Sequence, residues 1–153
     1  MARNRYKGNR IGGPFLALPR DVIDHPAFLR LSAYAKALLI DLGAQYKGGN
    51  NGDQCCAWKV MRPRGWRSEA TLHKAKHELL DAGFVFEARK GWRPNLCGLY
   101  ALTWLLLDPN PKHDCTPAAF ERHAYRRADS PTLICVRPHC AGLTTSRAVA
   151  RAA

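Results

Sequence analysis

The chain has 153 residues, of which 24 are Lys or Arg and 12 are Asp or Glu, so its formal net charge is +12. This length fits one domain with extensions, and a hydrophobic content of 46% is enough to bury a core. These values exclude a collagen-like or wholly disordered chain, and the aliphatic run 105–107 is far shorter than the roughly 20 residues of a membrane-spanning helix. The basic first ten residues lack the apolar stretch of a secretory signal, so we expect a cytoplasmic protein without a membrane partner.

The first clear helical signal begins at Ser32, which is a good N-cap residue. Upstream, the apolar run 15–18 predicts either an edge strand or an anchored lead-in, and the segment 21–31 has weak helical character that Pro26 interrupts. The apolar residues that follow Ser32 recur at helical spacing and predict one buried stripe: Ala35, Leu38, Leu39, Leu42 and Tyr46. The glycine-rich run 47–52 then predicts a turn, because it lacks the Gly-Lys-Ser/Thr ending of a phosphate-binding loop.

Two further helices and a hairpin are predicted in the next fifty residues. The segment 54–61 predicts a second helix that ends before Pro63, and 64–66 a tight turn. Ser68 is placed to cap a third helix over 69–82, for which Gly83 is a suitable C-terminal stop. The period then changes to two, which predicts strands over 84–89 and 96–104 joined by a basic turn.

The segment 108–153 contains five prolines and only scattered apolar residues. It predicts a mostly irregular basic tail, with one helical stretch near 117–127. We therefore divide the chain into a basic flexible arm over 1–14, a folded domain over 15–107 and this tail.

Positive charge is concentrated in the middle of the chain. Six basic residues opposed only by Glu69 fall within 18 positions: Lys59, Arg62, Arg64, Arg67, Lys74 and Lys76. A solvated helix face would alternate the two signs of charge, and this segment does not. The cluster therefore favours contact with a nucleic acid or another polyanion.

The predicted order of elements is helix, turn, helix, short turn, helix and basic hairpin, which is an α+β arrangement. Over about 15–107 the chain resembles the winged helix-turn-helix DNA-binding proteins found in phage, plasmid and other mobile-element genes. The stretches that carry this resemblance are Leu31-Ser32, Asn50-Asn-Gly52, Arg64-Gly-Trp-Arg-Ser-Glu-Ala-Thr-Leu72, Lys74-Ala75, Glu78-Leu-Leu-Asp-Ala-Gly83 and Leu99-Tyr-Ala-Leu-Thr-Trp104. The resemblance implies a three-helix core with a C-terminal β-hairpin wing and double-stranded DNA as the partner.

A helix fits the major groove of DNA, and small side chains near its N-terminus let its backbone approach closely. On this basis the groove-facing residues of the third helix are predicted to be Arg67, Ser68, Ala70, Thr71, Lys74 and His77. Ser68 and the helix N-terminus suit a phosphate, whereas Thr71 and Lys74 suit base edges.

Two basic flanks would hold the DNA backbone on either side of this helix. One comprises Lys59, Arg62 and Arg64, and the other Lys90 and Arg93 at the hairpin tip. Trp92 either packs beneath the wing or inserts at the DNA backbone. The arm residues Arg3, Arg5, Lys7 and Arg10 either track a groove or form an ordinary basic terminus.

The chain lacks the sequence signatures of an enzyme. We find no nucleophile elbow, paired carboxylates, phosphate loop or His-Glu-x-x-His, and we predict a non-enzyme without a cofactor. His113, Cys115, Cys135, His139 and Cys140 could in principle form a zinc site, but we expect none, because their spacing is looser than in zinc-binding motifs. His73 and His77 lie one turn apart, but phosphate or solvent contact is the favoured use, so no metal is predicted.

These features lead to one main functional hypothesis and two alternatives. The main hypothesis is a DNA-binding protein of a phage or mobile element that acts as a transcriptional regulator or replication factor. The alternative is a phage-encoded inhibitor that binds a host-defence nucleoprotein complex of the CRISPR type through protein contacts, because a fold does not determine its partner. A third hypothesis is an RNA-binding or architectural domain. The sequence carries no signal for the oligomeric state.

Overall fold

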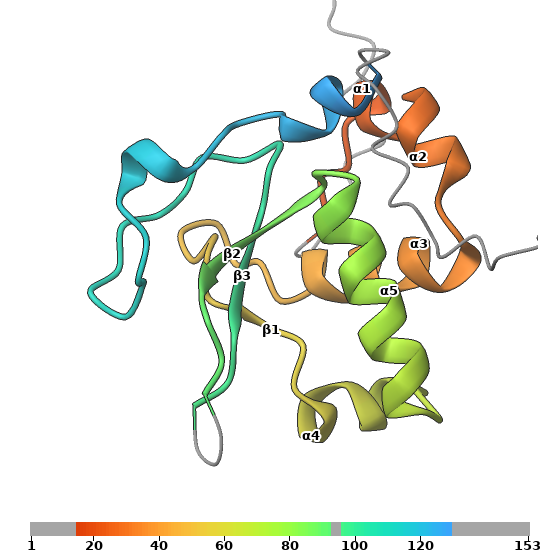
Figure 1. Cartoon of the computed structure of the whole chain (residues 1–153), viewed down its shortest axis with the longest axis horizontal. Coiled ribbons are helices and arrows are strands. Elements are labelled where there is room, and N and C mark those ends of the chain that lie inside the picture. Colours follow the sequence, from red (N-terminus) through yellow and green to blue (C-terminus); the bar gives the residue numbers. More distant parts are fainter. Residues whose placement is uncertain (1–14, 93–95, 130–153) are drawn as a thin grey trace, which may run out of the picture.

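The computed structural model describes residues 15–92 and 96–129, which form a mixed helical and β-sheet fold (Figure 1). Its helices are α1 (Arg20–Ile23), α2 (Pro26–Arg30), α3 (Ala33–Gly43), α4 (Trp58–Met61) and α5 (Glu69–Asp81). Its strands are β1 (Gln54–Cys55), β2 (Val85–Arg89) and β3 (Leu99–Leu102), and the 3-10 turn η1 (Arg62–Arg64) follows α4. The predicted α+β class is confirmed. None of the described helices is long and apolar enough to cross a bilayer.

Helix α3 begins as the sequence predicts, because the Ser32 hydroxyl accepts a hydrogen bond from the backbone N–H of Ala35 at 3.2 Å. The Glu78 carboxylate of α5 in turn accepts from both the backbone N–H and the hydroxyl of Ser32, each at 2.6 Å. This contact joins the start of α3 to the second half of α5. The apolar stripe of α3 is buried as predicted at Ala35, Leu38, Leu39 and Leu42.

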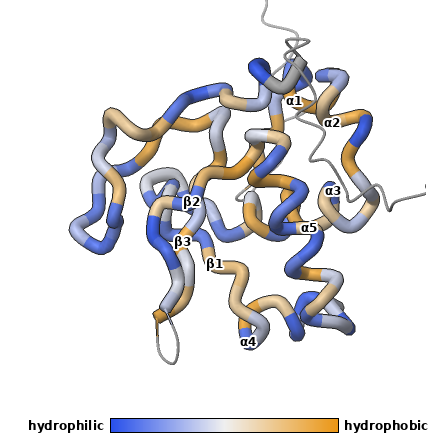
Figure 2. The backbone as a smooth tube through the Cα atoms, viewed as in Figure 1, coloured by the Kyte–Doolittle hydropathy of each residue, from blue (hydrophilic) through white to orange (hydrophobic). Residues whose placement is uncertain are grey.

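Helix α5 also follows the predicted boundaries. Leu72, Ala75 and Leu79 are buried and belong to the same apolar core as the stripe of α3. Gly83 follows the helix in the left-handed region, with φ of +74°, which a glycine adopts without strain. A Cβ atom there would also lie 2.8 Å from the backbone of Ala124, so the end of α5 fits closely against the later part of the chain. Hydrophilic and hydrophobic residues alternate along α5 as expected for a half-buried helix (Figure 2).

The sheet is antiparallel, with the strand order β1-β3-β2. The helix predicted over 54–61 is wrong in its first half, because Gln54 and Cys55 form a strand opposite Tyr100 and Leu99. Only Trp58–Met61 is helical. A two-residue strand has no periodicity of its own, so its pairing with β3 decided its conformation.

Two other predicted strands differ from the structure. The run 15–18 forms no strand, and the Leu16 side chain lies against Gly43 at the end of α3, as expected for the anchored lead-in. The strand predicted over 96–104 is regular only over Leu99–Leu102. Trp92 and Leu96 form an isolated bridge near the hairpin tip.

Asn51 connects three parts of the fold through a fully buried side chain. Its amide oxygen accepts from the backbone N–H of Leu102 at 2.8 Å, and its amide nitrogen donates to the carbonyl oxygens of Leu102 and Leu106 at 3.0 and 2.8 Å. Its backbone N–H donates to the Asp108 carboxylate at 2.7 Å. The loop before β1 is therefore attached to β3 and to the segment that follows it.

The chain remains packed beyond residue 107. Tyr125 is fully buried, stacks on Phe84 with ring centroids 4.9 Å apart and meets the edge of His25 at 5.1 Å. The helical stretch predicted near 117–127 is present as two 3-10 turns, η2 (Pro117–Ala119) and η3 (Ala124–Asp129). The core therefore includes a residue from the segment that the sequence presents as a tail.

Replacing Tyr125 with Ala tests whether this segment is part of the folded unit. Removing a buried aromatic ring leaves a cavity, and we expect a loss of about 3–5 kcal/mol in the free energy of unfolding. Urea unfolding followed by circular dichroism measures this loss. The exposed neighbour Arg122, replaced with Ala, is the control and is expected to change stability by less than about 0.5 kcal/mol. Equal stability of the two variants would contradict the packing of Tyr125.

Candidate nucleic-acid interface

The connection between α4 and α5 is short and sharply turned. Gly65, with φ of +97°, ends the 3-10 turn η1, and Ser68 then adopts the extended conformation of an N-cap. The Ser68 hydroxyl accepts a weak hydrogen bond from the backbone N–H of Thr71 at 3.4 Å, and Glu69 lies in the first turn. The start of α5 is thus placed close after the basic residues of α4 and η1.

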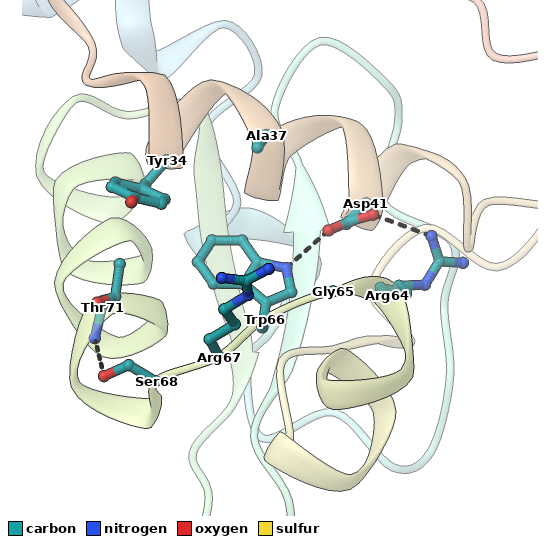
Figure 3. A pocket seen from close by; sticks show the side chains of 9 residues that line it. All are labelled: Tyr34, Ala37, Asp41, Arg64, Gly65, Trp66, Arg67, Ser68 and Thr71. Atoms are coloured by element: carbon teal, nitrogen blue, oxygen red, sulfur yellow. Dashed lines mark hydrogen bonds and ion pairs between the residues drawn. The ribbon is translucent and has the colours of Figure 1, made fainter.

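Asp41 of α3 holds this connection in place (Figure 3). One oxygen of its carboxylate accepts from the Trp66 indole N–H at 2.8 Å, and the other lies 3.1 Å from the Arg64 guanidinium. Trp66 is nearly buried, with 8% of its surface exposed. These contacts border a hollow of about 370 Å³ between α3 and the start of α5, which Tyr34, Arg67 and Thr71 also line.

The outward face of α5 has the composition that the sequence predicts. Ala70, His73, Lys74 and His77 are all exposed, opposite the buried stripe. The Nε2 atoms of His73 and His77 lie 3.3 Å apart, so one ring can donate a hydrogen bond to the other when both are neutral. A small residue, a lysine and two imidazoles therefore cover the first two and a half turns of the exposed face.

A second hollow, of about 430 Å³, connects α5 to the hairpin formed by β2 and β3. Lys76 and His77 line it from the helix, and Lys90 and Gly91 from the hairpin. The Lys76 ammonium lies 5.7 Å from the centre of the Tyr100 ring, within the range of a cation–π contact. Negative charge is also present here, because Glu87 lines the hollow and the backbone N–H of Lys90 donates to the Asp114 carboxylate at 3.1 Å.

The structure brings most of the predicted site residues to exposed positions around the start of α5. The exposed ones are Lys59, Arg62, Arg64, Arg67, Ser68, Lys74, His77 and Lys90. Thr71 is half-buried, and the guanidinium of Arg64 also forms an ion pair with Asp41. Arg93 and the arm residues lie outside the described residues. Trp92 is 75% exposed, which excludes the alternative that it packs beneath the hairpin. Its contact with the DNA backbone stays a prediction.

Three residues near this surface were not among the predicted site residues. His73 and Lys76 belong to α5, and the sequence already places His73 one turn from His77 and Lys76 in the basic cluster. Arg30 of α2 lines a hollow together with Lys74 and His77. No signal in the sequence connects Arg30 to α5, because their proximity comes from the packing of α2 in the folded chain.

The described residues contain no group of three or more His, Cys, Asp and Glu side chains placed to hold a metal ion. His113, one of the zinc ligands considered from the sequence, has a side chain that is only 4% exposed and lies 3.3 Å from the Asp53 carboxylate. The other His and Cys residues of that set, apart from Cys115, lie outside the described residues.

Comparisons with known proteins give no further information on this surface. The chain matches no protein-family model, no curated protein and no solved structure.

Replacing Asp41 with Ala tests its role at the α4–α5 connection. The Trp66 indole N–H would lose its acceptor and the Arg64 guanidinium its partner, and we expect a loss of about 1–3 kcal/mol in the free energy of unfolding. The buried indole accounts for most of this loss, since the partly exposed ion pair is screened by solvent. Urea unfolding measures it, with Asp24→Ala, an exposed carboxylate, as the control. A loss no larger than that of the control would contradict the role.

The pKa of His73 provides a second test. Partial desolvation of the ring lowers this pKa below 6.5, and the charges of Lys76 and His77 add to the effect. The charged side chains that line the same hollows as His73 are Arg30, Glu69, Lys74, Lys76, Glu78 and Asp81. Both Lys76→Met and His77→Gln should raise the pKa of His73 in an NMR titration, whereas Lys112→Met, at an exposed position elsewhere, should leave it unchanged.

The lowered pKa of His73 also makes the free energy of unfolding depend on pH. Because the folded pKa is lowered, the unfolded chain binds the proton more readily, and His73 reduces stability as the pH falls through about 6.5. His73→Gln should therefore lose less stability than the wild type between pH 7 and pH 5. An equal loss in both proteins would show that His73 does not titrate as described.

Proposed function

We propose that the protein binds double-stranded DNA as a winged helix, with α5 as the helix that enters the major groove and the β2–β3 hairpin as the wing. The chain order α3, β1, α4, α5, β2, β3 and the strand order β1-β3-β2 support this assignment. In such an arrangement the short strand after the first core helix pairs with the returning strand of the hairpin. The hairpin is thereby held beside the groove-binding helix.

The observation that carries the proposal is the exposed face of α5. Ala70 offers little steric obstruction, so the helix backbone can approach base edges, and Lys74 has a long donor in the next turn. Arg67 and Ser68 precede the helix at its N-terminus, where backbone N–H groups attract phosphate. Thirteen residues make a helix of about 20 Å, which is long enough to cross the groove.

Basic residues on both sides of this face would position the DNA backbone. Lys59 and Arg62 are exposed on the α4 side, and Lys90 is exposed on the hairpin side. Figure 1 shows α4, the start of α5 and the end of β2 on the same side of the molecule. One duplex could therefore contact all three.

We further propose that the protein reads a specific DNA site as a transcriptional regulator or replication factor of a phage or mobile element. The contacts proposed for Arg67 and Lys74 differ in kind from those of the flanks, since only side chains in the groove distinguish bases. Binding through the flanks alone would be independent of sequence. A preferred duplex is thus the decisive property of this function.

Selection of bound duplexes from a random pool, followed by fluorescence anisotropy on the selected site, tests the proposal. We expect a preferred site, and losses of about 5- to 20-fold in affinity for Arg67→Ala and Lys74→Ala, as for single groove contacts. Lys59→Ala should weaken all duplexes equally and reduce the salt slope by about one.

Lys112→Ala is the matched control, because Lys112 is an exposed lysine in the segment after the sheet. Its affinity for the selected site should match that of the wild type within about twofold. Absence of a preferred duplex would contradict sequence-specific binding. Equal losses for Lys74→Ala and Lys112→Ala would contradict the role of α5.

A further inference from the structure

Two histidine rings lie against each other on the exposed side of α5. His73 and His77 are four residues apart, and the Nε2 atoms of their rings are separated by 3.3 Å, with the ring centroids 4.3 Å apart. Both side chains are exposed. A spacing of four residues is the one at which zinc-binding helices place two histidine ligands on one face. The pair therefore presents two neighbouring nitrogen atoms to solvent.

The distance between these two nitrogens matches that of two ligands on one metal ion. Zinc binds an imidazole nitrogen at about 2.0–2.1 Å. Two such bonds to atoms 3.3 Å apart enclose an angle of about 107° at the metal, close to the tetrahedral angle of about 109°. Because both side chains are exposed, small rotations about their side-chain bonds can direct both lone pairs at the same ion. The ring pair is therefore a preformed pair of nitrogen ligands.

An anion fits this geometry less well than a cation does. A histidine ring that attracts phosphate through its charge is protonated and has a donor on each nitrogen. Two protonated rings with Nε2 atoms 3.3 Å apart would place like charges and two donors against each other. A metal ion instead accepts a lone pair from each neutral ring, and each ring keeps its proton on Nδ1. The geometry thus favours a metal ion over the phosphate contact that the sequence suggests.

Two carboxylates extend the row of histidines by one turn at each end. Glu69 precedes His73 by four residues and lines a hollow with it, and Asp81 follows His77 by four residues and lines a second hollow with both rings. Both carboxylates are exposed, whereas Glu78, which also lines the second hollow, is bound to the start of α3. The described residues contain no group of three side chains placed to bind a metal ion directly. Glu69 and Asp81 would therefore attract the ion through water molecules.

Three basic side chains near the same rings oppose a cation. Arg30 and Lys74 line the hollow beside both rings, and Lys76 lines the one beside His73. The Lys76 ammonium lies 5.7 Å from the centre of the Tyr100 ring, so part of its charge is engaged there. Electrostatic attraction alone would not hold a cation among these residues. The two nitrogen ligands must supply the affinity, which selects metals that prefer nitrogen over Mg²⁺ and Ca²⁺, which prefer oxygen.

We propose that His73 and His77 bind one divalent transition-metal ion, with their two Nε2 atoms as protein ligands and water in the remaining positions. Imidazole suits Zn²⁺, Ni²⁺ and Cu²⁺, and the angle at the metal fits the tetrahedral preference of Zn²⁺. Each bond replaces a water ligand of the ion. Because the two bonds join successive turns of α5, binding also stabilises the folded chain.

The position of the ion has a consequence for DNA binding, and this second step rests on the proposed function. The ion would lie on the face of α5 that meets the duplex, where it would add positive charge. Its water ligands could exchange for a phosphate oxygen or a base nitrogen. Zinc would therefore raise the affinity for duplex DNA, whereas the metal site itself does not depend on DNA binding.

Titration of the full chain with Zn²⁺, followed by NMR of the histidine ring protons in the presence of a non-thiol reductant, tests the site. We expect the Cε1–H signals of His73 and His77 to shift together and to saturate at the same zinc concentration. The signals of the other histidines report zinc that binds elsewhere on the chain. Competition with a chromophoric chelator should show one bound Zn²⁺ ion fewer in His73→Gln and in His77→Gln than in the wild type.

The matched control keeps two histidines on α5 but changes their spacing. Lys74→His combined with His77→Gln places the rings at adjacent positions, which project about 100° apart around the helix and cannot share one ion. This variant also removes a repelling charge, yet we expect its affinity for Zn²⁺ to be at least about tenfold lower. Circular dichroism checks that the helix is retained. A shift of only one ring, or equal affinity in this control, would overturn the proposal.

Fluorescence anisotropy on the selected duplex, with and without Zn²⁺ in a phosphate-free buffer, tests the second step. We expect zinc to raise the affinity of the wild type by about 3- to 10-fold and to leave that of His73→Gln unchanged. Equal affinity with and without zinc, while both rings shift, would overturn the effect on DNA. Because the NMR titration contains no DNA, failure of the metal site is distinct from failure of the proposed function.

Discussion

The buried amide of Asn51 occupies the place of a strand residue beside β3. It satisfies both the N–H and the carbonyl of Leu102 and so completes the ladder where β1 is too short to do so. Because β1 begins only three residues after Asn51, this contact also determines where β1 lies. The position of α4, and of the hairpin relative to α5, depends on that placement. An amide can replace a backbone partner because it carries a donor and an acceptor side by side.

Carboxylates within the described fold are used largely for internal contacts. Asp41 binds Trp66 and Arg64, Glu78 binds Ser32, and Asp108 binds the backbone of Asn51. Exposed positions around the start of α5 are meanwhile occupied mainly by basic and small residues. The net charge of +12 is therefore distributed unevenly over the surface. The exposed surface around the start of α5 is more positive than the composition alone indicates.

The candidate site could be predicted from the sequence where its residues share one helix. Ser68, Lys74 and His77 follow from the N-cap and from helical spacing, and all three are exposed. The contact between Arg64 and Asp41 could not be predicted from the sequence, because Asp41 lies on another helix. The hollow between α5 and the hairpin could not be predicted from the sequence either, since it depends on the register and shift of β2 against β3.

The sequence by itself determined α3, α5 and the start of β2, because caps and periodicity are local signals that act within a few residues. The tertiary structure alone decided that residues 54–55 form a strand, since β3 supplies its hydrogen-bond partners. It also decided that Tyr125 belongs to the core, by stacking it on Phe84. Both outcomes depend on contacts between distant parts of the chain, whose free energy outweighs weak local preference.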